Sequence, residues 1–403
     1  MTVEEACKKL LEEITPIDEK ETLAISSCNG RVLAEDVFAN LDVPSFPRSA
    51  MDGYAVKSCE VQGAAPESPV SLRVVDSLMA GDYKEIAYCK NSAVRVMTGA
   101  FIPPEYDCVV KQEDSDYGEK SVKIYAPQAA YTNYCKRGED IQSGQKLLCA
   151  GKVLKPLHAG LLASLGINKV SVYRKLKVSI ISTGSELCLP GNPLSPGKIY
   201  ESISPMLRAQ LFAQGIELVS ACICPDREEQ IADAVLMELK RSDVIITVGG
   251  VSVGKKDLVP SVLLNRLGAK KVFQGVDIQP GTPTMACFLE NKAILSLSGN
   301  PYAALANFEL YFWNMAAAYT KNSEYLPVLA DAVLKSPYNK INKHRRLLRA
   351  RYSKGDVYLP SKVHSSSVIS NLEDCNCYID LEALRSVSPG DTVRIRMMKG
   401  FTL

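Results

Sequence analysis

The feature that most constrains the fold of this 403-residue chain is a regular alternation of apolar runs and helical stretches between Lys175 and Lys321. Each apolar run is short and continuous, as in strands that are buried on both faces. Strands that alternate with helices form parallel sheets, so we predict a doubly wound α/β domain. Its strands are expected at residues 178–181, 218–223, 244–248 and 293–297, and its helices at 205–214, 228–239, 258–267 and 302–319.

Three of the predicted strands run directly into glycine loops. The loops contain Ser182, Thr183 and Gly184; Gly249, Gly250, Val251 and Ser252; and Ser298, Gly299, Asn300 and Pro301. Because the carboxyl ends of parallel strands line one crevice, the loops are expected to face one ligand. Glycine lets the backbone approach closely, and Asn300 before Pro301 fits a helix start, where N–H groups favour an anion. One such loop can equally be an ordinary tight turn, but three on one edge favour a binding site.

Acidic side chains are expected on the same edge of the sheet. They are Glu186, Asp226 directly after the strand at 218–223, and Asp257 after the double-glycine loop. Carboxylates beside phosphate-accepting backbone are unfavourable unless a cation lies between them, which makes Mg²⁺ the natural ligand. For each carboxylate alone, an interaction with a helix dipole explains the charge equally well.

The rest of the chain predicts smaller, mostly β parts. Thr2 and Glu5 form a capping box ahead of an amphipathic helix. Short runs between residues 70 and 125 predict a β-rich insert, and those from about residue 328 onward predict a small C-terminal β domain. The segment from Pro44 to Ala55, with its prolines, Asp-Gly pair and a methionine of buried type, is interpreted as a functional loop rather than helix or strand. The basic run 340–351 is interpreted as a charged β-hairpin with one ligand-facing arginine.

Composition excludes several classes of function. The 47 basic and 45 acidic side chains nearly cancel, which removes the electrostatic footprint of a protein that binds nucleic acid or a membrane surface. No apolar run reaches the length that spans a bilayer. The 13 cysteines are irregularly spaced and lack metal-site spacing, so we expect free thiols in a reducing cytoplasm. A cytoplasmic protein acting on a small molecule is therefore expected.

Motifs along the whole chain resemble the molybdopterin molybdenumtransferase family, the group of bacterial MoeA and the gephyrin E-domain. They are Pro44-Ser-Phe-Pro-Arg-Ser-Ala-Met-Asp-Gly-Tyr-Ala55, Met97-Thr-Gly-Ala100, Arg137-Gly-Glu-Asp-Ile141, Ser182-Thr-Gly-Ser-Glu186, Gly249-Gly-Val-Ser252 and Ser298-Gly-Asn-Pro301. The resemblance implies a MoaB/MogA-like doubly wound domain at 1–26 and 175–326 and an extended β linker domain at 27–45 and 142–174. It further implies a β-rich insert domain at 46–141 and a C-terminal β-barrel domain at 327–403.

The resemblance also implies a reaction, which is the Mg²⁺-dependent insertion of molybdate into adenylylated molybdopterin with release of AMP. The enzyme is expected to be an elongated cytoplasmic homodimer in which the insert reaches the partner's crevice. Carried over by motif, the catalytic residues are Asp52, Asp140, Glu186, Asp226 and Asp257, of which the last three favour the metal site. The substrate-binding residues add Thr98, Ser298, Asn300 and Pro301 and, by looser matches in the C-terminal domain, Arg349 and Ser370.

The chain departs from the family at Gln279-Pro-Gly-Thr-Pro283, where relatives usually carry Lys-Pro-Gly-Lys-Pro. The resemblance implies that those lysines hold oxyanion or phosphate groups. Gln279 and Thr282 can donate hydrogen bonds but add no charge, while Gly281 keeps the shape of the backbone. Each lost charge-assisted bond costs on the order of 1.5–3 kcal/mol, about tenfold or more in affinity. At Glu201, where relatives tend to carry aspartate, the charge is retained on a longer side chain.

Two hypotheses address the missing charge. Lys255 or Lys256 returns a positive charge to the crevice, or both lysines are simply solvated. The alternative to an insertase is a non-catalytic paralogue that binds molybdopterin or a partner enzyme. An insertase for another oxyanion, such as tungstate, is a third possibility, because tungstate and molybdate are tetrahedral dianions of nearly the same size.

Overall fold

The computed structural model describes residues 1–252, 257–361 and 368–402 of the chain. Contacts divide it into two compact units, one formed by Met1–Thr22, Gly30–Ala34 and Ser171–Leu403, and the other by Leu23–Asn29 and Glu35–Val170. Strands β1 (Lys20–Ala24) and β11 (Lys169–Tyr173) contain two of the boundaries between the units.

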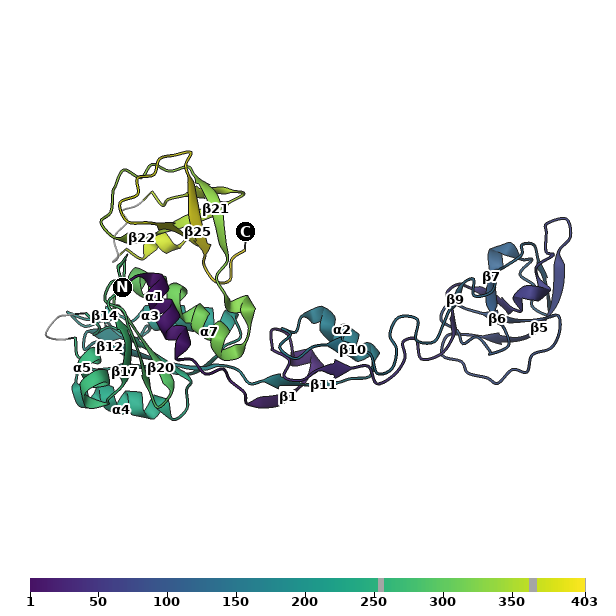
Figure 1. Cartoon of the computed structure of the whole chain (residues 1–403), viewed down its shortest axis with the longest axis horizontal. Helices are drawn as coiled ribbons and strands as arrows, with labels where there is room; N and C mark the ends of the chain where they lie inside the picture. The colour runs from purple at the N-terminus through teal and green to yellow at the C-terminus, as the bar shows by residue number, and fades with distance from the viewer. Residues whose placement is uncertain (253–256, 362–367, 403) are drawn as a thin grey trace. The chain divides into compact units, whose positions relative to one another are not determined.

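The first unit contains a six-stranded sheet (Figure 1). From one edge to the other its strands are β15 (Glu217–Cys224), β12 (Lys177–Thr183), β16 (Val244–Val248), β20 (Lys292–Leu297), β19 (Met285–Leu289) and β17 (Lys270–Gln274). The first four are parallel, as the sequence predicts. Strand β19 pairs antiparallel with both neighbours, so the sheet is mixed rather than purely parallel. The alternation that predicts parallel strands misses β17 and β19, because no helix separates either from the next strand.

Helices cover both faces of the sheet, which confirms the doubly wound architecture. Alternate residues of each central strand enter different cores: Ile180 and Ile246 pack in one cluster, and Ile181 and Ile245 pack in the other. The first cluster also holds residues of α1, α3 and α7, and the second holds residues of α4 and α5. The helices are α1 (Val3–Glu12), α3 (Ile203–Ala213), α4 (Glu228–Leu239), α5 (Val259–Ser261), α6 (Pro301–Asn307) and α7 (Trp313–Thr320), with π-helical segments η4 (Val262–Arg266) and η5 (Phe308–Phe312).

Helix α1 begins where the sequence predicts. The Glu5 N–H donates to Thr2 Oγ1 at 3.1 Å, and the Thr2 N–H donates to Glu5 Oε2 at 2.9 Å, so both halves of the capping box are formed. The predicted helices at 258–267 and 302–319 are each interrupted by π-helical turns at η4 and η5.

The C-terminal part of the first unit is a closed five-stranded barrel, which confirms the predicted β-barrel. Around the barrel, β22 (Arg345–Ser353) pairs with β23 (Asp356–Tyr358), then β21 (Leu329–Leu334), β25 (Thr392–Met397) and β24 (Cys377–Leu381), which pairs again with β22. Strand β22 connects two cores, because Leu347 packs with the sheet domain and Leu348 packs inside the barrel. The short strand β18 (Ile278–Gln279) leaves the sheet domain and pairs parallel with β22.

The second unit contains a five-stranded sheet ordered β7-β4-β6-β5-β8. Its elements are β2 (Val37–Phe38), β3 (Arg48–Ser49), β4 (Gly53–Val56), β5 (Val70–Leu78), β6 (Ser92–Val96), β7 (Cys108–Lys111), β8 (Ser121–Ile124), β9 (Tyr134–Cys135), β10 (Lys146–Leu148) and α2 (Pro156–Ser164). Interpreting the whole segment from Pro44 to Ala55 as a loop is wrong, because its end enters the fully buried strand β4. Gly53 permits this, since a Cβ there would lie 1.9 Å from Val110 O. Met51 is 41% exposed rather than buried.

All 13 cysteines lie in the described ranges and are free thiols, as the sequence predicts. Within the same ranges, no helix combines the length and the apolar character that crossing a membrane requires.

One buried acid lies where the sheet domain meets the barrel. Glu309 in η5 is 2% exposed and accepts hydrogen bonds from Gln210 Nε2 at 3.0 Å and from the Lys399 N–H at 3.3 Å. Burial disfavours the carboxylate and raises the pKa of Glu309 to about 7. The folded state therefore binds the proton of the Glu309 carboxyl group more tightly than the unfolded state does. The contribution of this protonation to the free energy of unfolding is complete below pH 4.5 and is lost as the pH rises through 7.

We therefore predict that Glu309→Gln flattens the pH dependence of stability. Relative to the variant, the free energy of unfolding of the wild type should fall by on the order of 3 kcal/mol between pH 4.5 and 8, because one pKa unit corresponds to about 1.4 kcal/mol. Urea unfolding across this range measures the difference. Glu229→Gln, at an exposed site, is the matched control. If the free energy of unfolding depended on pH in the same way for the wild type and Glu309→Gln, the raised pKa of Glu309 would be contradicted.

Candidate active site

A cleft of about 440 Å³ lies at the carboxyl ends of the parallel strands. It is lined by the residues that the sequence groups there and by their neighbours: Thr183, Gly184, Glu186, Leu187, Ile199, Tyr200, Glu201, Ser202, Ile203, Asp226, Val248, Gly249, Gly250, Asp257, Ser298, Gly299, Asn300 and Pro301. All three glycine loops contribute, so the expectation that they face one space is confirmed.

Gly249 and Gly250 are required because their loop touches the loop of Thr183. A Cβ on Gly249 would lie 2.5 Å from Thr183 O, and one on Gly250 would lie 3.0 Å from Thr183 Oγ1. Both glycines have positive φ, at 90° and 63°, which other residues rarely adopt. Gly299 lies beside them, and a Cβ there would make an ordinary contact of 3.5 Å with the Gly249 Cα. The floor of the cleft is therefore bare backbone.

The three predicted carboxylates all line this cleft. Asp226 ties two loops together, because the Ser185 N–H donates to Asp226 Oδ2 at 3.0 Å. Among the described residues, no group of three His, Cys, Asp or Glu side chains is close enough to hold a metal ion alone. Magnesium is usually held by one or two carboxylates together with substrate phosphates and water, and the cleft lining offers Glu186, Asp226 and Asp257 for that mode of binding.

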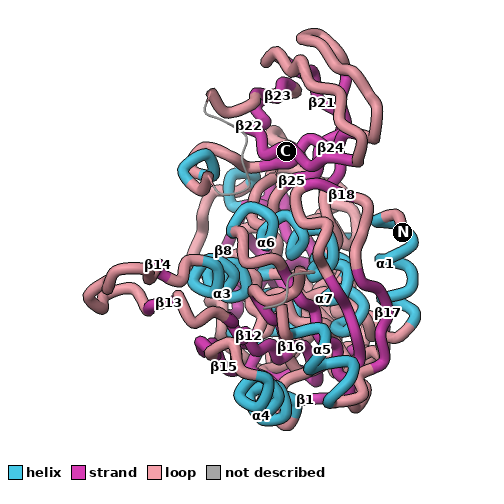
Figure 2. The backbone as a smooth tube through the Cα atoms, turned by 90° about the vertical axis from the view of Figure 1, so that its left-hand side faces the viewer, coloured by secondary structure: helices cyan, strands magenta, loops and turns pink. Residues whose placement is uncertain are grey.

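Glu201 is a further residue of the cleft, at the position where relatives tend to carry aspartate and for which no sequence motif predicts a site role. The side chain is 3% exposed and lines the cleft. Its Oε1 accepts from the Ile203 N–H at 3.0 Å and the Ser204 N–H at 2.8 Å, and its Oε2 accepts from Ser204 Oγ at 2.5 Å. Glu201 thus fixes the first turn of α3. Glu201 directly follows β14 (Ile199–Tyr200) in the chain. Strand β14 pairs with β13 (Leu187–Cys188), and Figure 2 shows these two strands extending to the left of the sheet domain.

A second pocket of about 250 Å³ shares Ser298 and Asn300 with the cleft. Its lining is Gln279, Pro280, Gly281, Thr282, Pro283, Ser298, Asn300, Tyr302, Ala303 and Arg346. The departure from the Lys-Pro-Gly-Lys-Pro motif therefore lies in a pocket that adjoins the cleft. Thr282 Oγ1 donates to Ile278 O at 2.7 Å, so this hydroxyl proton is engaged within its own loop.

Arg349 lies outside the lining of both pockets. Its side chain is fully buried, its guanidinium carbon lies 4.2 Å from the centre of the Tyr302 ring, and its Nη1 donates to Val368 O. The Arg349 N–H also donates to Tyr302 Oη at 3.0 Å. Arg349 therefore positions Tyr302, and the arginine that lines a pocket is Arg346, which no sequence motif singles out. The sequence feature that could have located Arg346 is the basic run on β22, but the register of the strand decides which arginine faces the pocket.

The other sequence-predicted residues of the first unit lie apart from the cleft lining. Ser182 is buried and donates to Glu201 Oε1 at 3.3 Å, and Val251 packs in the core on the α4 side of the sheet. Ser252 is exposed and does not line the cleft. Lys255 and Lys256 lie outside the described residues.

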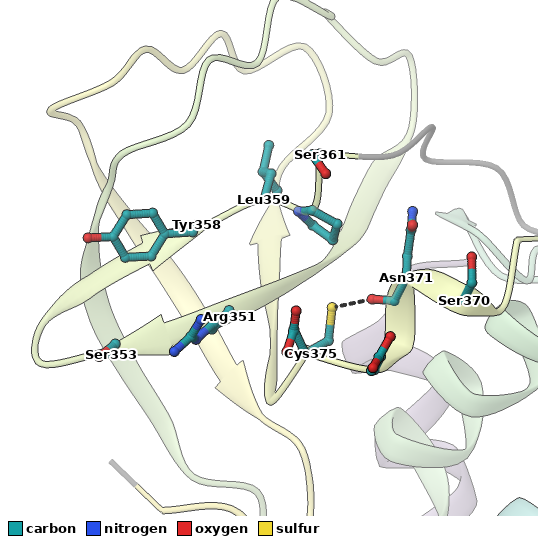
Figure 3. Close-up of a pocket in the computed structure, with 11 residues that line it drawn as sticks. Arg351, Ser353, Tyr358, Leu359, Ser361, Ser370, Asn371 and Cys375 are labelled. Atoms are coloured by element: carbon teal, nitrogen blue, oxygen red, sulfur yellow. Dashed lines mark hydrogen bonds between the residues drawn. The ribbon is translucent and has the colours of Figure 1, made fainter.

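Ser370 lines a separate pocket of about 490 Å³ in the barrel domain (Figure 3). It begins the short helix η7 (Ser370–Leu372), and Arg351 and Tyr358 contribute from β22 and β23. Cys375 Sγ donates to Asn371 O at 2.9 Å. Ser370 is therefore not brought together with the residues of the cleft.

The remaining predicted residues, Asp52, Thr98 and Asp140, belong to the second unit. Asp52 and Thr98 meet because β4 and β6 pair antiparallel. The Thr98 N–H and Oγ1 both donate to Asp52 Oδ1 at 2.7 Å, and these bonds hold the pKa of Asp52 below its usual value. Asp52 is thus fixed as a carboxylate. Asp140 is exposed in the segment before Ile141.

Comparison with known proteins identifies the family. The MoeA N-terminal region (domain I and II) matches residues 1–166, the probable molybdopterin binding domain matches 179–317, and the MoeA C-terminal region (domain IV) matches 331–396. The molybdopterin molybdenumtransferase of Bacillus subtilis is 34% identical over 389 residues, which cover 94% of this chain and 90% of that protein. The enzyme of the same name from Staphylococcus epidermidis strain RP62A is 33% identical over 384 residues, covering 94% and 91%.

Solved structures agree with the sequence relatives. A crystal structure of the molybdopterin biosynthesis MoeA protein of Pyrococcus horikoshii superimposes with a TM-score of 0.87 at 29% identity and covers 100% of both chains. A second structure of MoeA, from P. horikoshii OT3, superimposes with a TM-score of 0.81 at 28% identity and covers 98% of this chain and 99% of that one. The chain therefore belongs to the molybdopterin molybdenumtransferase family, enzymes of molybdenum cofactor biosynthesis.

Proposed function

We propose that this chain inserts molybdate into adenylylated molybdopterin and releases AMP in a Mg²⁺-dependent reaction. The observation that carries the proposal is the junction of two pockets of opposite character. A cleft with a bare backbone floor and four carboxylates, Glu186, Glu201, Asp226 and Asp257, adjoins a smaller pocket that contains Arg346. A ligand with a phosphate at one end and an oxyanion acceptor at the other matches that arrangement.

The carboxylates and the glycine loops have different tasks in this proposal. Backbone N–H groups around Gly184, Gly250 and Gly299 bind the phosphate of the adenylyl group. One or two of the carboxylates of Glu186, Asp226 and Asp257 would hold Mg²⁺ together with the substrate phosphate, and the metal would neutralise charge on the phosphate that leaves as AMP. Ser298 and Asn300 line both pockets, and together with Thr183 and Pro301 of the cleft they orient the ligand.

We further propose that the active enzyme is a cytoplasmic homodimer in which Asp52 completes the partner's cleft. The two hydrogen bonds from Thr98 keep the Asp52 carboxylate ionised and oriented, which suits a residue that meets a metal or a proton at neutral pH. By its motif, Asp140 is proposed to act together with Asp52 at the partner's cleft.

A non-catalytic molybdopterin-binding paralogue is the second candidate. One observation favours it: the hydroxyl of Thr282 is engaged with Ile278 O and Gln279 carries no charge, so neither reproduces a lysine. An insertase for tungstate is compatible with the same pockets, because the two oxyanions share charge and geometry.

We predict that the purified protein releases AMP from adenylylated molybdopterin when Mg²⁺ and molybdate are both present. Release is measured by chromatography in the presence of molybdate, tungstate or neither oxyanion. Asp226→Asn, which keeps the shape of the side chain, should lower the rate by roughly 100-fold or more, because it removes a charge from the metal site.

A Gln279→Lys, Thr282→Lys double variant separates the two candidates. Oxyanion-dependent release by the wild type supports the insertase. Release by the double variant alone would establish that the wild type is the non-catalytic paralogue, and release driven by tungstate but not by molybdate would assign the other oxyanion.

We also predict that Asp52→Ala abolishes turnover and that hybrid dimers regain it. If Asp52 acts on the partner's cleft, a dimer of one Asp52→Ala subunit and one Asp257→Ala subunit retains one complete site. Its activity should reach about half that of the wild-type dimer, since one of two equivalent sites works. If each subunit used its own Asp52, the hybrid would be inactive. Melting temperatures check folding, and the exposed Glu85→Gln in the same insert serves as the control.

A further inference from the structure

The two adjoining pockets differ sharply in charge. Among the described residues that line the cleft there are four carboxylates and no lysine or arginine. The described lining of the second pocket has no carboxylate and one cationic side chain, Arg346. An anion that carries two negative charges is therefore repelled by the cleft wall and attracted to the second pocket.

Strand register places Arg346 in that pocket. Strand β18 pairs parallel with β22, and Gln279 lies opposite Arg346. The neighbouring Arg345 has different partners: it forms ion pairs with Glu4 and with Asp380, the latter at 2.7 Å. Within the described ranges, no carboxylate forms an ion pair with Arg346, so its charge is not neutralised.

The guanidinium of Arg346 also retains donor capacity. Its Nη1 donates to Asn342 Oδ1 at 3.1 Å, and its Nε is buried without a hydrogen-bond partner among the described residues. A buried donor without a partner is costly, and a ligand oxygen in the pocket would remove that cost. A guanidinium presents its donors in a planar fork that suits two oxygens of one oxyanion.

The other polar groups of the pocket are neutral. Thr282 donates to Ile278 O, whereas Ser298 Oγ accepts from the Asn300 N–H at 3.2 Å and so keeps its own proton to donate. Gln279 contributes an amide. These groups can orient an oxyanion, but they cannot balance its charge.

We infer that Arg346 is the residue that binds the oxyanion substrate, a tetrahedral dianion, in the pocket formed by the 279–283 loop and Ser298. The inference rests on the proposed function for the identity of the oxyanion. It deepens that function by assigning the positive charge to β22 of the barrel domain. Arg346 is then a substrate-binding residue, and Arg349 holds the Tyr302 wall of the same pocket.

The test measures oxyanion binding by Arg346→Met and Arg346→Lys. Equilibrium dialysis with molybdate at fixed ionic strength should show a Kd for Arg346→Met about tenfold or more above that of the wild type, because a charge-assisted hydrogen bond is lost. Arg346→Lys should lose less, because it keeps the charge and loses only the fork. In turnover, the KM for molybdate should rise by the same factor while the KM for adenylylated molybdopterin stays constant. Arg394→Met is the control, since Arg394 lies on β25 with a side chain that is 63% exposed.

A charge-relocation variant guards against a folding artefact. Because Gln279 lies opposite Arg346, Gln279→Lys in the Arg346→Met background returns a cation to the same pocket from the other strand. Recovery of molybdate binding would support the inference and exclude simple unfolding. A Kd for Arg346→Met equal to that of the wild type would overturn it. So would weak binding that Gln279→Lys fails to restore although the melting temperature is unchanged.

The outcomes also separate this inference from the proposed function. A wild type that binds molybdate through Arg346 but releases no AMP would contradict the insertase and leave the role of Arg346 intact. A wild type that releases AMP with an unchanged KM for molybdate after Arg346→Met would retain the insertase and overturn the role of Arg346.

Discussion

Strands β12, β16 and β20 end level with one another, and the cleft depends on that register. Ser182 lies opposite Val248, and Val248 lies opposite Leu297, so all three loops leave the sheet at the same height. At that height a Cβ on Gly249 would lie 2.5 Å from Thr183 O, so no side chain fits between these two loops. A shift of one residue in any strand would replace glycine by a side chain and turn buried faces outward. The register of the strands thus determines both the packing of the sheet and the shape of the ligand site.

The second pocket depends on a different connection, because it is built between the sheet domain and the barrel. Strand β22 supplies Leu347 to one core and Leu348 to the other. Arg349 and Tyr302 fasten β22 to α6 through a cation–π contact and a hydrogen bond from the Arg349 N–H to Tyr302 Oη. Glu309 closes the same junction with bonds to Gln210 and Lys399. A charge contributed by the barrel is therefore held against the carboxyl edge of the sheet by buried contacts rather than by a mobile surface.

The sequence predicts features that depend on local pattern and misses those that depend on distant pairing. Continuous apolar runs locate the parallel strands, and the Thr2–Glu5 capping box locates the start of α1, because both signals lie within a few residues. The glycine loops and carboxylates follow from the rule that strand ends share an edge. Strands β17 and β19 are missed because their pairing is antiparallel and has no helical crossover, and β4 is missed because a turn motif precedes it directly.

The arginines of β22 show most clearly what the sequence alone cannot predict, which is the side chain that faces the ligand pocket. From sequence alone, Arg345, Arg346 and Arg349 are nearly equivalent members of a basic strand. Their positions differ because alternate residues of a strand face opposite sides and because β18, far away in the chain, pairs with one end of β22. Burial then converts Arg349 into a support for Tyr302, two carboxylates neutralise Arg345, and only Arg346 brings an unneutralised charge to a pocket among the described residues. A missing lysine at position 279 can thus be offset by an arginine on the strand beside it, which a comparison confined to one motif does not detect.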